Sequence, residues 1–192
     1  MKSKRQEAVE KAMSLYWEKG FHATSMRNIQ EVINMRPGSI YASFGSKEGL
    51  FRESLQQYAD INLTGIEKLR EQAASPLGAL RALMERSVTE SRQSAPNGMC
   101  MLVKTIVELT DENSDLLGEA TRLLQDVEKA FERIINDAKA CGEIGHSNDT
   151  ARVARYFQVQ LMGVRTYANT HDDEDSINML IDDVFSSPLL GA

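Results

Sequence analysis

Cysteine and long apolar runs are both scarce in this chain. It holds Cys100 and Cys141 in 192 residues, and two cysteines are too few for a disulfide framework, so a reducing compartment is expected. No stretch approaches the roughly 20 apolar residues that a membrane-spanning helix needs. The N-terminus is charged and lacks the apolar core of a signal peptide. We therefore predict a cytoplasmic protein with no membrane partner.

Strand patterns are missing as well. No run shows sustained alternation of β-branched and polar residues, and glycine and proline are sparse within the long periodic segments. An apolar content of 42% at this length is enough for a packed core in one or two small domains. The sequence therefore predicts an all-α fold.

Catalytic and metal-binding patterns are also lacking. There is no Ser/His/Asp arrangement, Gly-rich phosphate loop or metal-ligand spacing. The segment 171–175 has the composition of a metal patch, but acidic residues favour a helix N-terminus, so we expect a solvated helix start. An all-α enzyme with Cys100 as nucleophile is the alternative, but its base would have to be His22, His146 or His171, which form no recognisable arrangement. We predict no metal, no cofactor and no enzymatic activity.

Charge is distributed unevenly along the chain. Residues 1–52 hold nine Lys or Arg against five Asp or Glu, a net charge of +4. The remaining 140 residues hold 13 against 23, a net charge of −10. A basic segment attached to an acidic body keeps attraction to nucleic acid local and reduces non-specific binding.

The stretch from residue 24 to 49 predicts two short helices and the start of a third. In the first helix, apolar residues recur at the spacing of a buried face, at Met26, Ile29, Val32 and Ile33. Asn34 tolerates a left-handed backbone and can end that helix. Pro37 suits the first turn of the next helix, because its missing N–H has no partner there.

The second short helix, residues 37–44, is expected to bury Ile40 and Phe44. Small and polar residues are left outside, at Arg36, Gly38, Ser39, Tyr41, Ala42 and Ser43. An exposed helix of this kind, held by an apolar neighbour, is what a helix-turn-helix places in the major groove of DNA. Helix pairs joined by a turn also occur in all-α proteins that do not bind DNA, so the spacing leaves both readings open.

Residue identities add to the spacing. The chain reads Gly20-Phe21-x-x-Thr24-Ser25-Met26-Arg27-x-Ile29 and then Gly38-Ser39-Ile40-Tyr41-x-x-Phe44-x-Ser46-Lys47-Glu48-x-Leu50. These motifs resemble the DNA-binding domain of TetR/AcrR-family transcriptional regulators. The resemblance implies a three-helix helix-turn-helix domain over residues 1–46, with its motif at about 25–44. A helical effector-binding and dimerisation domain over residues 47–192 would follow.

The resemblance also implies a set of DNA-contacting residues and a partner, double-stranded DNA with a palindromic operator. Tyr41 and Lys47 match family positions that hold the DNA backbone. Thr24, Ser25 and Ser46 lie at helix starts, where exposed N–H groups suit a phosphate. Family members often carry Ser-Lys at 36–37, so the Arg-Pro found here changes the groove-facing chemistry. The full predicted set is Thr24, Ser25, Arg27, Arg36, Pro37, Gly38, Ser39, Tyr41, Ser46 and Lys47.

Beyond the motif, the pattern predicts six further helices, at 47–74, 77–93, 99–109, about 115–140, 149–169 and 174–185. Residues 94–98 read as a loop, and the helix at 99–109 is apolar nearly all round, which predicts burial on most sides. In the family, the last two helices pair with their copies in a second subunit. The predicted homodimer interface is Val153, Phe157, Leu161, Val164, Ile177, Leu180, Ile181 and Val184. The alternative is that these faces pack inside one subunit.

Cys100 suggests a sensor. The run from Cys100 to Leu109 is similar to a pattern in the NemR-like subfamily, in which a cysteine reacts with electrophiles or oxidants and DNA is released. Lys104, one turn on, has the right spacing to favour the thiolate. Met84 and Met99 are candidates for lining an adaptable effector pocket. The alternative is that Cys100 and the methionines are ordinary core residues. We predict a homodimeric repressor released by an unknown small molecule or by modification of Cys100.

Overall fold

The computed structural model describes residues 3–93 and 98–190, and in these ranges it is helical with no strand. The helices are α1 (Lys4–Lys19), α2 (Met26–Ile33), α3 (Pro37–Phe44), α4 (Lys47–Gln72), α5 (Pro76–Gln93), α6 (Met101–Glu108), α7 (Ser114–Ala140), α8 (Thr150–Thr170) and α9 (Glu174–Phe185), with a short 3₁₀ turn, η2, at Asp111–Asn113. The all-α prediction is confirmed, and the predicted helix bounds agree within about two residues. Of the predicted 94–98 loop, residues 94–97 lie outside the described ranges.

The chain divides into two compact units. The first contains the residues up to Ile61 together with Met101–Leu124, and the second contains Asn62–Cys100 with the residues from Gln125 on. The sequence-based boundary after residue 46 falls inside the first unit. None of the helices in the described parts of the chain is both long and apolar enough to cross a membrane.

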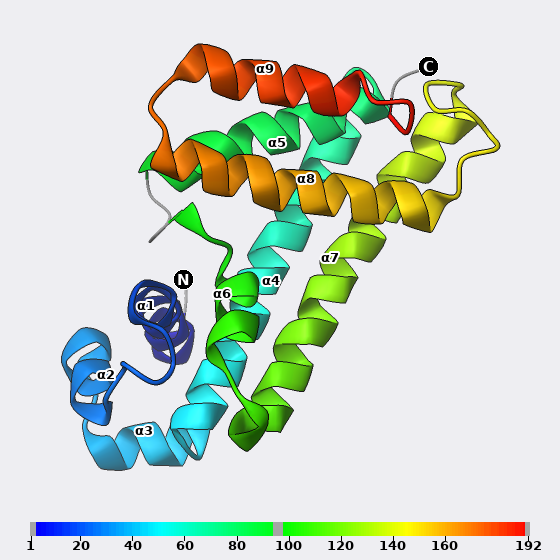
Figure 1. Cartoon of the computed structure of the whole chain (residues 1–192). Coiled ribbons are helices and arrows are strands. Elements are labelled where there is room, and N and C mark those ends of the chain that lie inside the picture. The colour runs from blue at the N-terminus through cyan, green and yellow to red at the C-terminus, as the bar shows by residue number, and fades with distance from the viewer. Residues whose placement is uncertain (1–2, 94–97, 191–192) are drawn as a thin grey trace. The chain divides into compact units, whose positions relative to one another are not determined.

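The first unit is built on an aromatic core beneath the three N-terminal helices. In it α1 packs against α2, and α2 packs against α3 (Figure 1). The Tyr16 ring meets the Phe51 ring edge-on at 4.7 Å between centroids, and Phe21 lies 4.9 Å from Phe51. These rings are almost entirely buried, so the core joins α1, the chain that follows α1, and α4.

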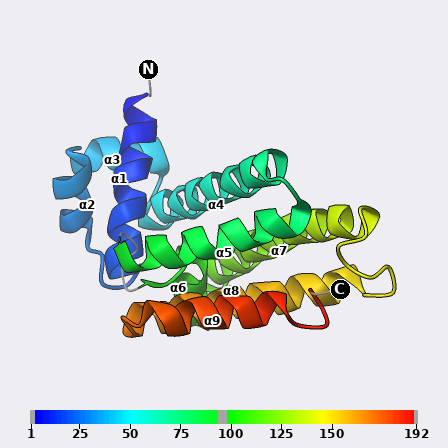
Figure 2. The same ribbon diagram turned by 90° about the horizontal axis from the view of Figure 1, so that it is seen from above.

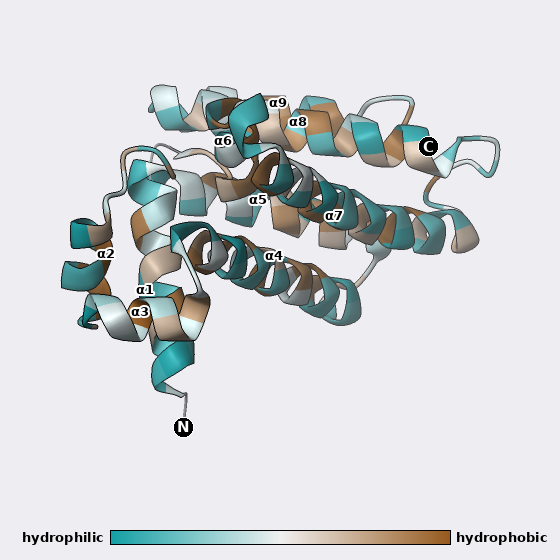
Figure 3. Cartoon of the chain, turned by 90° about the horizontal axis from the view of Figure 1, so that it is seen from below, coloured by the Kyte–Doolittle hydropathy of each residue, from teal (hydrophilic) through white to brown (hydrophobic). Residues whose placement is uncertain are grey.

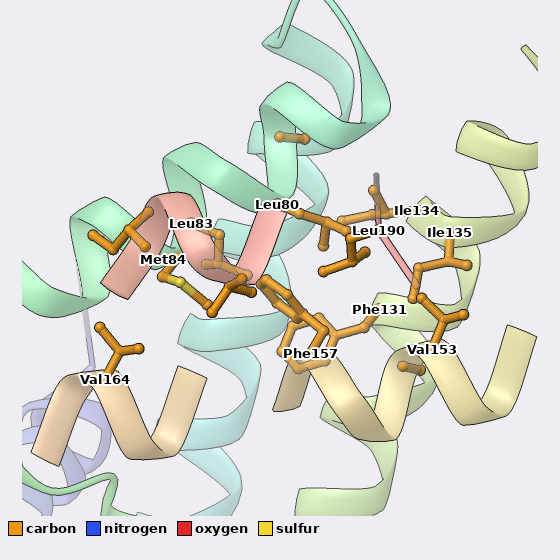
Figure 4. Packing of buried hydrophobic residues seen from close by; sticks show 14 of the residues in the cluster. Leu80, Leu83, Met84, Phe131, Ile134, Ile135, Val153, Phe157, Val164 and Leu190 are labelled. Atoms are coloured by element: carbon orange, nitrogen blue, oxygen red, sulfur yellow. The ribbon is translucent and has the colours of Figure 1, made fainter. Parts of the chain in front are cut away.

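The second unit is a layered helical bundle. In it α5, α8 and α9 pack side by side (Figure 2). Phe131 and Phe157 meet edge-to-face at 5.0 Å between ring centroids, within a large apolar cluster (Figure 4). Edge-to-face contacts suit the quadrupoles of the two rings and add to the stabilisation from burial.

Two expected buried positions are exposed. Val32 is 39% exposed, because the eight-residue α2 turns only Ile29 and Ile33 fully into the core. Figure 3 shows hydrophilic residues on the outer side of this helix. Val107 is 76% exposed, because α6 buries a single stripe, Met101, Leu102 and Thr105. Val107 is therefore the exception to the prediction that this helix is buried on most sides, since the other residues of 99–109 are buried or half-buried.

An ion-pair network ties α4 to α7 within the second unit. The Glu67 carboxylate lies 2.7 Å from an Arg133 guanidinium nitrogen and 3.2 Å from Arg70, and Arg70 also pairs with Asp137 at 2.6 Å. The hydrogen bond from Arg133 is the main cause of a lowered pKa for Glu67, with Arg70 adding to it. Hydrogen bonds to Asp137 and Glu67 raise the pKa of Arg70 in turn.

We predict that this network makes stability depend on acid pH. The Glu67 pKa is lower in the folded chain than its ordinary value of 4.5, so its contribution is fully present above pH 4.5 and is lost as pH falls through the folded pKa. Urea unfolding of the wild type and of Glu67→Gln should therefore differ at pH 7 and converge in more acidic buffer. Glu71→Gln, an exposed carboxylate on the same helix, is the control. A difference that is independent of pH would contradict the assignment.

Candidate DNA-binding surface

The turn between α2 and α3 has the predicted backbone. Asn34 ends α2 in the left-handed conformation, with φ 53° and ψ 47°, which asparagine tolerates better than most residues. Pro37 occupies the first turn of α3, and the Arg36 backbone before it is extended. The Arg36 side chain makes no capping bond to α3. Pro37 has no N–H, and the Ser39 and Ile40 N–H groups donate to the Arg36 carbonyl at 2.9 and 3.1 Å, so Gly38 carries the remaining N–H of the first turn of α3.

The short helix α3 is anchored on one side and open on the other. Ile40 is completely buried and Phe44 is 7% exposed, and these two residues fix the helix against the first unit. Tyr41 is 50% exposed. The remaining predicted groove-facing residues are also exposed, namely Arg36, Pro37, Gly38 and Ser39. The structure thus brings five predicted DNA-contacting residues together on one surface.

The start of α2 lies in the same unit and is capped as predicted. The Ser25 hydroxyl accepts a hydrogen bond from the Asn28 backbone N–H at 3.2 Å, and the Asn28 side chain accepts one from the Ser25 N–H at 3.0 Å. This reciprocal cap leaves Ser25 exposed. Arg27 is also exposed, and its guanidinium pairs with Glu31 one turn on at 2.9 Å. The hydrogen bond to Glu31 raises the pKa of Arg27.

Thr24 is a correction to the predicted contact set. It is completely buried, and its hydroxyl donates a 2.6 Å hydrogen bond to the Gly20 carbonyl. A buried hydroxyl satisfied in this way is not available to a phosphate, because DNA cannot reach it without opening the loop. Thr24 instead holds the chain between α1 and α2 in a fixed shape.

The start of α4 carries the last two predicted contacts. The Ser46 hydroxyl accepts a hydrogen bond from the Gly49 N–H at 3.1 Å, as expected of a cap. The Lys47 ammonium lies over the Phe21 ring, 4.3 Å from its centroid, and partial burial lowers the pKa of Lys47. A side chain on Gly49 would collide with the Phe44 carbonyl, so glycine is needed where α3 and α4 meet.

The predicted effector residues are divided between the two units. Met84 is completely buried in the apolar cluster of the second unit, while Met99 and Cys100 are half-buried. Lys104 belongs to the first unit, where its ammonium donates to the Trp17 and Glu18 carbonyls. The spacing of Lys104 from Cys100 did not predict this contact with the end of α1.

A cavity of about 430 Å³ lies in the second unit, near the ends of α5 and α8. None of the predicted effector residues lines it; its walls are Val88, Thr89, Arg92, Ala168, Asn169, Asp172 and Glu174. In the cavity wall, the Arg92 guanidinium pairs with two acidic neighbours, Glu174 at 3.4 Å and Asp172 at 3.7 Å.

The predicted dimer residues need a second correction. Six of the eight are at most 5% exposed within a single chain, namely Val153, Phe157, Val164, Ile177, Ile181 and Val184. They belong to the apolar cluster that α5, α7, α8 and α9 share (Figure 4). A residue buried in its own protomer cannot be covered by a second one. Only Leu161 and Leu180 keep partial exposure. The exposed apolar residues of these helices are instead Val159, 59% exposed, and Met179, 62% exposed.

Comparisons with known proteins agree with this architecture. A model of bacterial regulatory proteins of the tetR family matches residues 8–54, and a model of a tetracyclin repressor-like C-terminal domain matches residues 76–183. The HTH-type transcriptional repressor ComR of Escherichia coli (strain K12) is 27% identical over 167 residues, which cover 83% of this chain and 77% of ComR.

Solved structures share the fold. A cysteine mutant of the TetR family regulator CifR, complexed with 26-base-pair double-strand operator DNA, superposes with a TM-score of 0.84 at 23% identity, covering 95% of this chain and 96% of that chain. The reduced form of E. coli NemR gives a TM-score of 0.84 at 14% identity, over 95% and 96% of the two chains. The matching family model describes regulatory proteins and ComR is a transcriptional repressor, in agreement with the prediction that the chain is not an enzyme. Because the family models match more than half of its length, the chain belongs to the tetR family of bacterial regulatory proteins and is a DNA-binding transcriptional regulator.

Proposed function

We propose that the protein is a homodimeric repressor that binds a palindromic operator in the cytoplasm and leaves it when an effector acts on the body. Residues 1–46 bind DNA, and residues 47–192 serve effector binding and dimerisation. The observation that carries this proposal is α3, an exposed helix held by the two buried anchors Ile40 and Phe44. The operator complex of CifR, which has the same fold, supports it.

The exposed residues suggest distinct roles at the DNA. Arg36 lies at the start of α3, where a guanidinium reaches either guanine edges or phosphates. Tyr41 and the Ser25 hydroxyl suit phosphate oxygens, and the N-terminus of α2 adds N–H groups that favour an anion. The net charge of +4 over residues 1–52 strengthens the attraction.

We expect Arg36→Ala to weaken operator binding by about 1–3 kcal/mol, roughly 5- to 150-fold, through loss of a charged contact to DNA. Binding of the purified protein to the promoter region of its own gene, followed by fluorescence anisotropy at several salt concentrations, measures this. Lys68→Ala, an exposed cation on α4 outside the proposed surface, is the control. Absent or salt-insensitive binding by the wild type would refute the proposed function.

The dimer surface proposed here is the outer face of α8 and α9. Val159 and Met179 are exposed near the midpoints of their helices. On α8, Gly163 lies one turn after Val159, and nothing lies within 4 Å of the position a side chain would occupy there. A small exposed residue beside an exposed apolar one allows close approach of a helix from a second copy.

Charge along the same face fits a two-fold axis through these midpoints. Arg152 and Arg155 are exposed at the start of α8, and an acidic run, residues 172–175, follows its end. A two-fold axis across the middle of α8 sets the start of one helix against the end of its copy. The arginines of each protomer would then meet the acidic run of the other. Electrostatic complementarity of this kind fixes register in an interface.

Release is proposed to follow from a change of geometry between the two DNA-binding segments. Half-sites on one face of DNA lie about 34–36 Å apart, so a shift of a few ångströms prevents both from docking together. In the released conformation the two DNA-binding segments of the dimer lie farther apart than the half-sites. An effector that binds this conformation more tightly shifts the population toward it. Cys100 is half-buried and not sealed in the core, which supports modification of its thiol as one route to release.

The hypothesis that modification of Cys100 triggers release can be tested separately. Operator release by N-ethylmaleimide is expected for the wild type and for Cys141→Ser, but not for Cys100→Ser. If release persists in Cys100→Ser, Cys100 is not the trigger and a non-covalent effector is the remaining route.

A further inference from the structure

Two side chains of α6, Lys104 and Glu108, bind the backbone of the segment that connects α1 to α2. We call residues 17–22 the α1–α2 corner. The Lys104 ammonium donates hydrogen bonds to the Trp17 carbonyl at 2.8 Å and to the Glu18 carbonyl at 2.7 Å. The last carbonyls of a helix have no partner within it, and a cation there also meets the negative end of the helix dipole. Lys104 therefore closes the end of α1.

Glu108, one turn after Lys104, holds the other side of the corner. Its carboxylate accepts hydrogen bonds from the Phe21 N–H at 3.1 Å and the His22 N–H at 2.7 Å. Between the two contacts lies Gly20, with φ +86°, where a side chain would be strained and would collide with the Glu108 carboxylate. The shape of the corner and the position of Glu108 are therefore matched to one another.

The corner in turn sets the start of α2. The Gly20 carbonyl accepts the hydrogen bond of the buried Thr24 hydroxyl, and Ser25, the next residue, caps α2. The Phe21 ring packs on Phe51 and lies beneath the Lys47 ammonium at the start of α4. A shift of the corner would therefore move the start of α2 and disturb the start of α4.

We propose that Lys104 and Glu108 are positioning residues for operator recognition. They touch no DNA themselves but hold the α1–α2 corner so that α2 and α3 keep the geometry that docks into the groove. This inference rests on the proposed function. Loss of either residue is expected to weaken base-specific docking, which depends on geometry, much more than the phosphate attraction that drives non-specific binding.

The test compares operator with a random-sequence duplex of equal length, at one salt concentration. Glu108→Ala and Lys104→Met should each lower operator affinity about tenfold, as expected for losing a hydrogen bond to a charged group, while random-sequence affinity changes less than about twofold. Glu108→Gln keeps one acceptor oxygen and should lie between the wild type and Glu108→Ala. Glu112→Gln, an exposed neighbour on η2, and Lys68→Met are the matched controls.

Hydrogen exchange gives a readout that does not depend on DNA. Glu108→Ala should accelerate exchange at the Phe21 and His22 amides, which its carboxylate binds, and leave α8 unchanged. If Glu108→Ala does not fold, Lys104→Met and Glu108→Gln still test whether the α1–α2 corner positions α2. Lys104→Met removes the bonds to the Trp17 and Glu18 carbonyls, and Glu108→Gln weakens those to the Phe21 and His22 amides.

The outcomes separate the inference from the proposed function. If the wild type fails to bind operator, the proposed function fails first. If the wild type binds and both variants bind equally well with unchanged exchange, the positioning role is overturned. Equal losses on operator and random-sequence DNA would also overturn it, because they would indicate an electrostatic or a general folding effect.

Discussion

Val159→Asp combined with Met179→Asp is expected to yield a monomer and to lower operator affinity by about 10²- to 10⁴-fold, the range by which linked binding events exceed single ones. Each substitution would place a carboxylate at the centre of the proposed two-fold interface, where it would face its own copy. Both side chains are more than half exposed in the protomer, so the fold should tolerate the change. Light scattering after size exclusion measures the mass, and anisotropy measures operator affinity.

Val107→Asp is the matched control for this experiment. Val107 is an exposed valine in the first unit, 76% accessible, and its replacement adds one carboxylate, of the two that the double variant adds, away from the proposed interface. It should leave the mass unchanged and lower operator affinity far less than the double variant does. A double variant of α8 and α9 that remained a dimer would place the interface on another face of the chain.

Phe157→Ala is expected to lower the free energy of unfolding by about 3–5 kcal/mol, the usual cost of removing a buried phenyl ring and leaving a cavity. Phe157 is completely buried and meets both Phe131 and Phe185 at ring-centroid distances of 5.0 and 6.3 Å. Urea unfolding at a fixed protomer concentration measures the change, since a dimer's stability depends on concentration.

Tyr156→Ala, at the neighbouring and only half-buried position on α8, should cost much less than Phe157→Ala. If the two variants unfold at the same urea concentration, the second unit does not depend on the ring cluster that Figure 4 shows. A loss below about 1 kcal/mol for Phe157→Ala would be equally inconsistent with a core position.

The parts of the structure that the sequence predicted correctly are governed by local chemistry. Asn34 in the left-handed conformation, Pro37 in the first turn of α3, and the capping residues Ser25 and Ser46 each depend on a few neighbouring atoms. Backbone preference and side-chain reach decide such positions without reference to the rest of the chain. For that reason the helix-turn-helix could be placed from the sequence alone.

What the sequence did not predict depends on partners that are distant along the chain. Phe157 and Val164 are apolar at helical spacing, and that pattern does not tell whether the face meets its own chain or a second copy. Glu108 and Phe21 are 87 residues apart, so no local pattern joins them. Thr24 had two possible uses, a phosphate or the Gly20 carbonyl, and only the fold of the loop decides between them.

The pairing of α6 with the α1–α2 corner bears on how the regulator can be re-engineered. Grafting only residues 1–46 onto the body of a relative would leave the Trp17 and Glu18 carbonyls and the Phe21 and His22 amides facing a foreign α6. A hybrid designed to read a new operator should also import Lys104 and Glu108, or the donor's equivalents. The natural module for exchange is therefore discontinuous along the chain, with one piece in residues 1–46 and another in α6.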